Sequence, residues 1–228
     1  SLDVLNRAWG SVFSQWEDVA PSVRGALRGA ERYGAWLDWR LHMDSILLDA
    51  HERAETAIRN MDASAWAVPV LMDAFGPEAG VDWWRMARAL EGLVVQNDIV
   101  AIETARSAKY ANPKKASLYR GLYVSTVNSE AEARWLPWHA ALHGMNALWV
   151  DTREIAANTG NLSTMAGAVA VLKSGLGALL HDARRPAAPV AIVYSQASRY
   201  LCAANPELSD TDAAMRDAMR LLDRKGYV

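Results

Sequence analysis

Short apolar runs alternate with amphipathic stretches along most of this chain, and this alternation is the feature that most constrains its fold. The apolar runs are short and flanked by turn-forming residues, as buried strands are. Strands are expected at residues 65–72, 93–96, 118–127, 147–150 and 190–194. Pro69 weakens the first of them, because proline cannot donate a hydrogen bond within a sheet. Strands that alternate with helices at this spacing predict a parallel sheet.

Between the apolar runs, hydrophobic residues recur every three or four positions, which is typical of helices packed on a core. Such stretches predict helices at residues 36–60, 82–90, 99–110 and 165–179. Ser209 is the expected N-cap of a last helix. Residues 225–228 resemble a helix stop followed by the start of another strand.

The composition bounds the class of protein. The chain has 228 residues, of which 51% are hydrophobic, so it can bury a sizeable core. A net charge of −2 argues against a dedicated nucleic-acid binder. The chain has no run of about 18 apolar residues, so no membrane span is expected. Cys202 is the single cysteine, which excludes an internal disulfide and fits a reducing compartment such as the cytoplasm.

Polar and aromatic residues follow several expected strands. Because ligands of parallel α/β proteins bind at the carboxyl ends of strands, these residues are candidate site residues. They are Asp73, Asn97, Asp98, Trp149 and Asp151. The chain has ten Trp and only two Phe, and indole rings are common where proteins bind sugars.

Each candidate also has a purely structural interpretation. Asp98 could cap the helix that follows it, and Trp149 could be ordinary packing. His139 and His143 have the i, i+4 spacing of zinc ligands, but Ala140 stands where the zincin motif needs Glu. A hydrogen bond from His143 at the end of its helix is therefore the preferred interpretation.

Several segments resemble glycoside hydrolase family 42, the β-galactosidase-like enzymes. Residues 5–22 resemble the stretch after the fourth barrel strand, with Leu5, Asn6, Trp9, Gly10, Trp16 and Pro21 in the family's pattern. Residues 36–45 resemble the long helix that follows, and residues 139–151 resemble the last barrel strand with the turn before it. Residues 172–180 and 189–198 resemble the passage into the family's second domain. The ordered set covers almost the whole chain.

This resemblance implies an α/β fold: a partial (β/α)8 TIM barrel holding strands five to eight, followed by the start of a flavodoxin-like domain. Residues 1–185 would belong to the barrel, and residues 186–228 would begin the second, trimerisation-type domain. The chain would then be a fragment of a longer enzyme.

The implied activity is β-galactosidase-like hydrolysis of a glycosidic bond, by a retaining mechanism without a cofactor or metal. Such enzymes use two carboxyl groups roughly 5–5.5 Å apart. In the family the acid/base Glu precedes the segment that begins at Leu5, so it is not in this chain. The nucleophile Glu should end the strand at residues 118–127, where no Glu stands.

Glu130 and Asp98 are the catalytic candidates that remain. Glu130 also fits the acidic first turn of a helix capped by Asn128 or Ser129. The resemblance adds Trp9 to the substrate-binding candidates. The expected partners are a carbohydrate and, as in the family, further copies of the chain in a trimer, with neither nucleic acid nor membrane.

Two alternatives remain open. The chain could be a non-catalytic carbohydrate-binding relative that has lost its nucleophile, or a structural module that mediates oligomer contacts. A pair of carboxylates facing one cleft favours the enzyme, and an aromatic cleft without that pair favours the binding protein.

Overall fold

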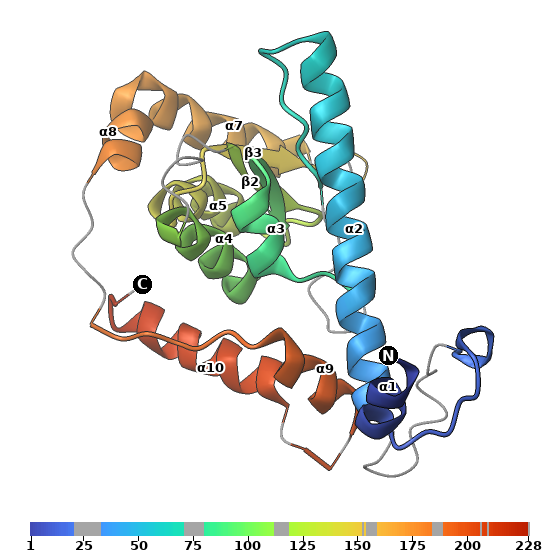
Figure 1. Ribbon diagram of the computed structural model, residues 1–228. Helices are drawn as coiled ribbons and strands as arrows, with labels where there is room; N and C mark the ends of the chain where they lie inside the picture. The colour runs from blue at the N-terminus through green and yellow to red at the C-terminus, as the bar shows by residue number, and fades with distance from the viewer. Residues whose placement is uncertain are drawn as a thin grey trace.

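The computed structural model describes residues 1–20, 33–70, 80–111, 119–151, 153, 159–183, 189–205, 207–208 and 210–227. Helices predominate among them (Figure 1). The α-helices are α1 (Leu2–Trp9), α2 (Tyr33–Met61), α3 (Trp83–Ala89), α4 (Ile99–Ala111), α5 (Glu130–Leu142), α7 (Thr159–Val171), α8 (Gly177–Asp182), α9 (Gln196–Ala204) and α10 (Thr211–Arg224). A 3-10 turn, η1 (Trp16–Asp18), and a π-helical segment, η6 (Leu172–Leu176), complete the set.

The described strands form one three-stranded sheet in the order β1 (Gly92–Gln96), β2 (Tyr119–Val124) and β3 (Ala147–Val150). All pairs are parallel, as expected, with Val94 opposite Gly121 and Tyr123 opposite Trp149. The strand expected at residues 147–150 is confirmed exactly, and β1 and β2 lie within a residue or two of their expected starts.

The expectation of a TIM-barrel half with strands five to eight, followed by a flavodoxin-like domain, is wrong. Of residues 65–70 only Val70 pairs with the sheet, through a single bridge to Val94. Residues 190–194 have strong β propensity but form no strand. Their side chains Ile192 and Tyr194 instead pack against the helical core, so tertiary packing overrides local preference. The boundary expected at residue 185 falls outside the described residues, and the division into domains stays a prediction.

The main core lies between the sheet and its helices. One face of the sheet contributes Leu93, Val95, Leu122 and Val124. Helices α3, α4 and α5 cover this face with small and medium-sized side chains, such as Met86, Ala101 and Leu136. Val94 points to the other face and is fully buried, yet it is not part of this core. Helices therefore cover one face of the sheet, whereas Val94 lies on the opposite face and outside this core.

Helix α2 runs along one side of the molecule, from α1 at its amino end to well past the sheet (Figure 1). Its 29 residues span about 43 Å at 1.5 Å per residue. The apolar stripe that predicted this helix is partly exposed at Met43, Ile46 and Ile58. The residues that α2 buries are Asp44, Leu48 and Glu55. Helix α2 thus presents two carboxylates as well as Leu47 and Leu48 to the rest of the molecule.

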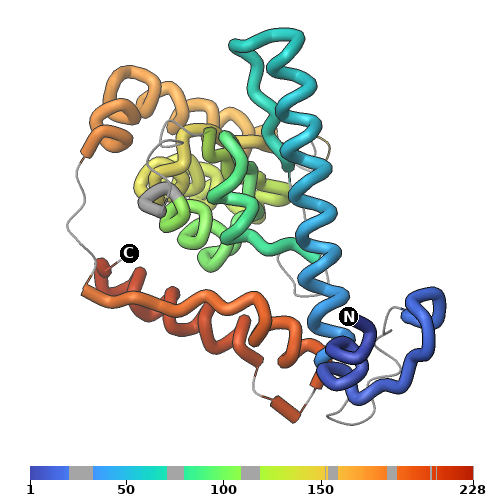
Figure 2. Tube along the Cα trace, in the orientation of Figure 1, coloured from blue at the N-terminus to red at the C-terminus, as the bar shows by residue number. Residues whose placement is uncertain are grey.

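Helices α9 and α10 form a separate layer below α3 and α4 (Figure 2). They contact α2 and α4, respectively. The expected helix stop is present, since α10 ends at Arg224 and Gly226 has a φ of +75°. Of the strand expected to start there, Tyr227 is not in a strand and Val228 lies outside the described residues. Ser209 lies outside the described residues, and the N-cap of α10 is Asp210, whose side chain accepts hydrogen bonds from the amides of Asp212 and Ala213.

Replacing Asp210 by alanine should lower the free energy of unfolding by about 1 kcal/mol, because two amides at the start of α10 lose their acceptor. Asp217→Ala is the matched control, since Asp217 is an exposed residue in the middle of the same helix. Urea denaturation of the two variants measures the difference. Equal stabilities would show that Asp210 does not cap the helix.

One described helix, Thr159–Asp182 with its π-helical segment, is long and apolar enough to cross a membrane by length and composition alone. This differs from the expectation of no such segment. Its first half, α7, buries Asn161, Met165 and Ala168, and packs along α5. That packing places α7 in the outer helical layer of the fold.

Candidate functional site

The second face of the sheet carries aromatic side chains. In a parallel pair of strands, the side chains of opposite residues point to the same face of the sheet. The side chains of every second residue along one strand also point to the same face. Tyr119, Gly121 and Tyr123 of β2 therefore lie on the same face as Trp149 of β3. Trp66 joins them from the segment after α2, with its ring 5.9 Å from that of Tyr119 in an edge-to-face arrangement. We call Trp66, Tyr119, Tyr123 and Trp149 the aromatic surface.

The orientation of Trp149 is fixed by two neighbours. Its indole Nε1 donates a hydrogen bond to the Tyr119 hydroxyl. Gly121 leaves the space beside the ring, since a Cβ atom there would lie 3.2 Å from the indole and 2.8 Å from a methyl of Val94. Trp149 nevertheless stays 42% exposed and Trp66 51% exposed. Two indoles are thus held in place while part of each ring faces solvent.

Asp151 lies directly after β3, at the edge of the aromatic surface. Its Oδ2 accepts a hydrogen bond of 3.0 Å from the Tyr123 hydroxyl. Its Oδ1 accepts one of 3.0 Å from the amide of Arg153, and the Arg153 guanidinium contacts both oxygens. The hydrogen bonds from Arg153, followed by that from Tyr123, hold the pKa of the Asp151 carboxyl well below its usual range. Asp151 is therefore an ionised acceptor at neutral pH and not a proton donor.

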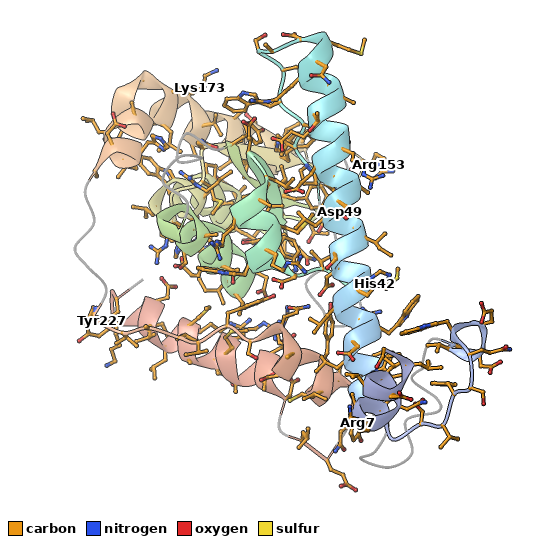
Figure 3. The ribbon with its side chains drawn as sticks, viewed as in Figure 1. Arg7, His42, Asp49, Arg153, Lys173 and Tyr227 are labelled. Atoms are coloured by element: carbon orange, nitrogen blue, oxygen red, sulfur yellow. The ribbon has the colours of Figure 1, made fainter. Side chains whose placement is uncertain are left out.

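The other end of this ion pair faces outward. The Arg153 side chain is 85% exposed and extends past α2 to the outside of the molecule (Figure 3). Asp151, by contrast, is 12% exposed and is fixed by three groups. A ligand on the aromatic surface would meet a pre-oriented carboxylate at its edge.

Asp98 has a different environment from Asp151. Its Oδ1 accepts hydrogen bonds from the amides of Val100 and Ala101, and so caps α4. Its Oδ2 accepts a hydrogen bond of 2.9 Å from Nε of Arg216 on α10. Asp98 therefore connects two helices, whereas Asp151 contacts the aromatic surface, and Asn97 is exposed beside Asp98.

Glu130 is the first residue of α5. Ser129 caps this helix by accepting a hydrogen bond from the amide of Glu132, which agrees with the capping interpretation of this segment. Glu130 is exposed and pairs with Arg134 at 3.0 Å. Nothing in this geometry desolvates the Glu130 carboxylate.

The two remaining candidates lie elsewhere. Trp9 ends α1, next to the amino end of α2, and its Nε1 donates a hydrogen bond of 2.8 Å to Asp38. Figure 1 shows α1 well away from the sheet. Asp73 lies outside the described residues. The structure thus brings Trp149 and Asp151 together at one strand end, but places Trp9 and Asp98 in other surroundings.

Residues that the sequence did not single out form two buried polar clusters. In the first, the Tyr200 hydroxyl of α9 donates a hydrogen bond of 2.5 Å to Oδ1 of Asp44 on α2. Burial raises the pKa of Asp44 to about 6. In the second, Arg199 of α9 is 2% exposed and binds both oxygens of Asp212. In both clusters the interacting residues are distant in sequence or lie on different helices, so no local sequence pattern predicts these contacts.

His139 of α5 and His143, the C-cap of that helix, form a third cluster with acidic residues. His143 Nδ1 lies 2.7 Å from Glu103 of α4, which confirms the expected hydrogen bond at the helix end. The His139 and His143 rings are 4.3 Å apart, and burial, followed by the charge of His143, lowers the pKa of His139 to about 4. Within the described ranges, no group of three or more His, Cys, Asp or Glu side chains could hold a metal ion.

Comparison with known proteins adds no assignment: no family model, no curated protein and no solved structure matches this chain. The geometry of the aromatic surface is therefore the basis on which a function can be inferred.

Proposed function

We propose that this chain binds carbohydrate on the aromatic surface and does not cleave it there. The observation that carries the proposal is the partly exposed indole of Trp149, which is held beside Gly121 by its hydrogen bond to Tyr119 on the same surface as the Asp151 carboxylate. A sugar presents an apolar face of C–H groups and an edge of hydroxyls. A rigid aromatic ring suits the first, and a fixed acceptor suits the second.

The state of the carboxylates favours binding over hydrolysis. A retaining glycosidase needs one carboxyl group that donates a proton and one that attacks as a nucleophile. Asp151 is held ionised by Arg153, Asp98 is paired with Arg216, and Glu130 is paired with Arg134. All three carboxylates are thus engaged by an arginine, and the pKa of Asp151 is held well below its usual range, the opposite of what a general acid needs.

Titration of the 228-residue chain with galactose and lactose in a calorimeter tests the proposal. Trp149→Ala should weaken binding at least about tenfold, the equivalent of 1.4 kcal/mol, because the stacking platform is removed. The matched control is Trp135→Ala on α5, since Trp135 is 53% exposed but lies outside the aromatic surface. This control should bind like the wild type.

Two results would contradict the proposal. One is the absence of binding at millimolar sugar concentrations, or equal loss in both variants. The other is hydrolysis of a nitrophenyl β-galactoside by the chain that collapses in Glu130→Gln. That second result would support the glycosidase that the family-42 resemblance implies.

A further inference from the structure

A second candidate site lies beside the amino end of β3, next to helix α5. A cavity of about 400 Å³ opens between α5, the beginning of β3 and the arm formed by α7, η6 and α8. Its walls include Pro137, Ala141, Met145, Leu148, Leu172 and Ala178. This volume lies in the range of known small-molecule sites, about 300–1,000 Å³. The walls are largely apolar, which suits an apolar ligand.

The outer wall of the cavity is an irregular helix. Between α7 and α8 the chain forms the π-helical segment η6, and Gly175 within it has a φ of +121°, which side-chain-bearing residues rarely adopt. At Gly177 a Cβ atom would lie 3.0 Å from the carbonyl oxygen of Leu172. The two glycines therefore permit a local widening and kink of the helix.

The kink turns α8 back over the cavity. Helix α8 contacts α5, yet α8 buries none of its own residues. It therefore covers the cavity without filling it. Leu176 and Leu179, on the same arm, are 39% and 69% exposed.

The polar side chains that border the cavity define its ligand further. Lys173 and His181 both line it, and both are exposed. The Lys173 side chain extends from the arm into solvent (Figure 3). Its aliphatic stem can thus lie along the apolar wall while the ammonium group remains hydrated. Asp182 is next to His181 in the sequence and is also exposed, so its carboxylate disfavours an anion near His181. Lys173 is therefore the stronger anchor for an anion.

We propose that this cavity binds a medium-chain fatty acid, with the acyl chain between α5 and η6 and the carboxylate at Lys173 and His181. A methylene group takes up somewhat less than the ~30 Å³ share of a water molecule in the liquid, so the cavity holds an aliphatic chain on the order of ten carbons. The Lys173 ammonium group selects an acid over a neutral alcohol. This site is independent of the sugar site proposed above.

Calorimetric titration with decanoate is the first test. Saturable one-to-one binding is expected, and Ala141→Phe should weaken it at least about tenfold, because the new ring occupies the cavity. Ala131→Phe is the matched control: it introduces the same side chain into the same helix, at an exposed residue that does not line the cavity. Lys173→Gln should weaken binding of decanoate several-fold and leave binding of 1-decanol unchanged.

Photo-crosslinking tests the site without any substitution, which keeps the proposal testable if Ala141→Phe does not fold. A decanoate analogue with a terminal diazirine should label residues 137–148 and 172–178, as mapped by mass spectrometry. Labelling elsewhere, or no saturable binding, overturns the proposal. So does labelling spread along the outer side of α7 together with binding to phosphatidylcholine vesicles, since the arm would then be a membrane-binding surface.

Discussion

Replacing Arg199 by methionine is expected to lower the free energy of unfolding by about 3–5 kcal/mol, because the substitution leaves Asp212 as an uncompensated buried charge. The Arg199 side chain is 1% exposed, and its guanidinium binds Asp212 through Nε at 2.6 Å and through a terminal nitrogen at 2.8 Å. Its other terminal nitrogen donates to the Tyr194 hydroxyl and to Gln196. Arg199 thus joins α9, α10 and the extended segment before α9.

Urea denaturation of the wild type and three variants measures the effect. Arg199→Met combined with Asp212→Leu should recover much of the loss, because the pair is then replaced by apolar side chains. Arg216→Met provides a matched control on α10. Arg216 also pairs with an aspartate, Asp98, but its side chain is 30% exposed, so its loss should cost only about 1 kcal/mol. If Arg199→Met cost no more than Arg216→Met, the buried pair would not hold the two helices.

Replacing Asp44 by asparagine is expected to change how stability depends on pH. The pKa of Asp44 is raised to about 6, from 3.8, chiefly by burial and against the opposing hydrogen bond from Tyr200. The groups that face it are Tyr200 on α9, Asp82 and Arg85 on α3, and Arg40 on α2. Asp44 is 3% exposed, and its Oδ2 has no hydrogen-bond partner.

The sign of the effect follows from proton binding. Between about pH 4 and pH 6 the unfolded chain releases the Asp44 proton while the folded chain keeps it, so stability falls as pH rises. A shift of about two pKa units corresponds to about 3 kcal/mol. Relative to Asp44→Asn, the wild type should therefore lose about 2 kcal/mol of stability between pH 4 and pH 7, since part of the effect is already lost at pH 4.

Stability differences at matched pH are the right readout. His139, with its lowered pKa of about 4, gives the opposite trend: its stabilisation is lost as pH falls from about 6.5 to 4. That contribution is common to the wild type and to Asp44→Asn, so it cancels in the difference. Asp49→Asn, at an exposed residue of the same helix, should show no such pH dependence relative to the wild type. A constant difference across this range for Asp44→Asn would contradict the prediction.

The elements that could be predicted from sequence are those whose pattern and packing agree. Strand β3 was predicted to the residue, because a short apolar run between a glycine turn and an aspartate has few other conformations. Residues 190–194 have a stronger β pattern, but the side chains of Ile192 and Tyr194 find their burial against helices. Propensity alone could not show that residues 190–194 do not pair with a neighbouring strand.

The candidate site was predictable in part, for a related reason. Trp149 and Asp151 stand at the end of a strand, and strand order alone placed them on one edge. The role of Asp98 depends on Arg216, which lies 118 residues away, and the apolar stripe of α2 did not reveal that Asp44 is buried. Sequence periodicity reports which residues share a face, but it does not report which face finds a partner.

The hydrogen bond between Asp44 and Tyr200 has a consequence for protein synthesis, since the two residues are 156 positions apart. At about 5–20 residues per second, a ribosome needs on the order of 10–30 s to make the intervening chain. During that interval the face of α2 that α9 will cover is open to water. The carboxylate of Asp44 is hydrated during that interval. A leucine at position 44 would instead expose an apolar side chain and favour aggregation with other unfinished chains.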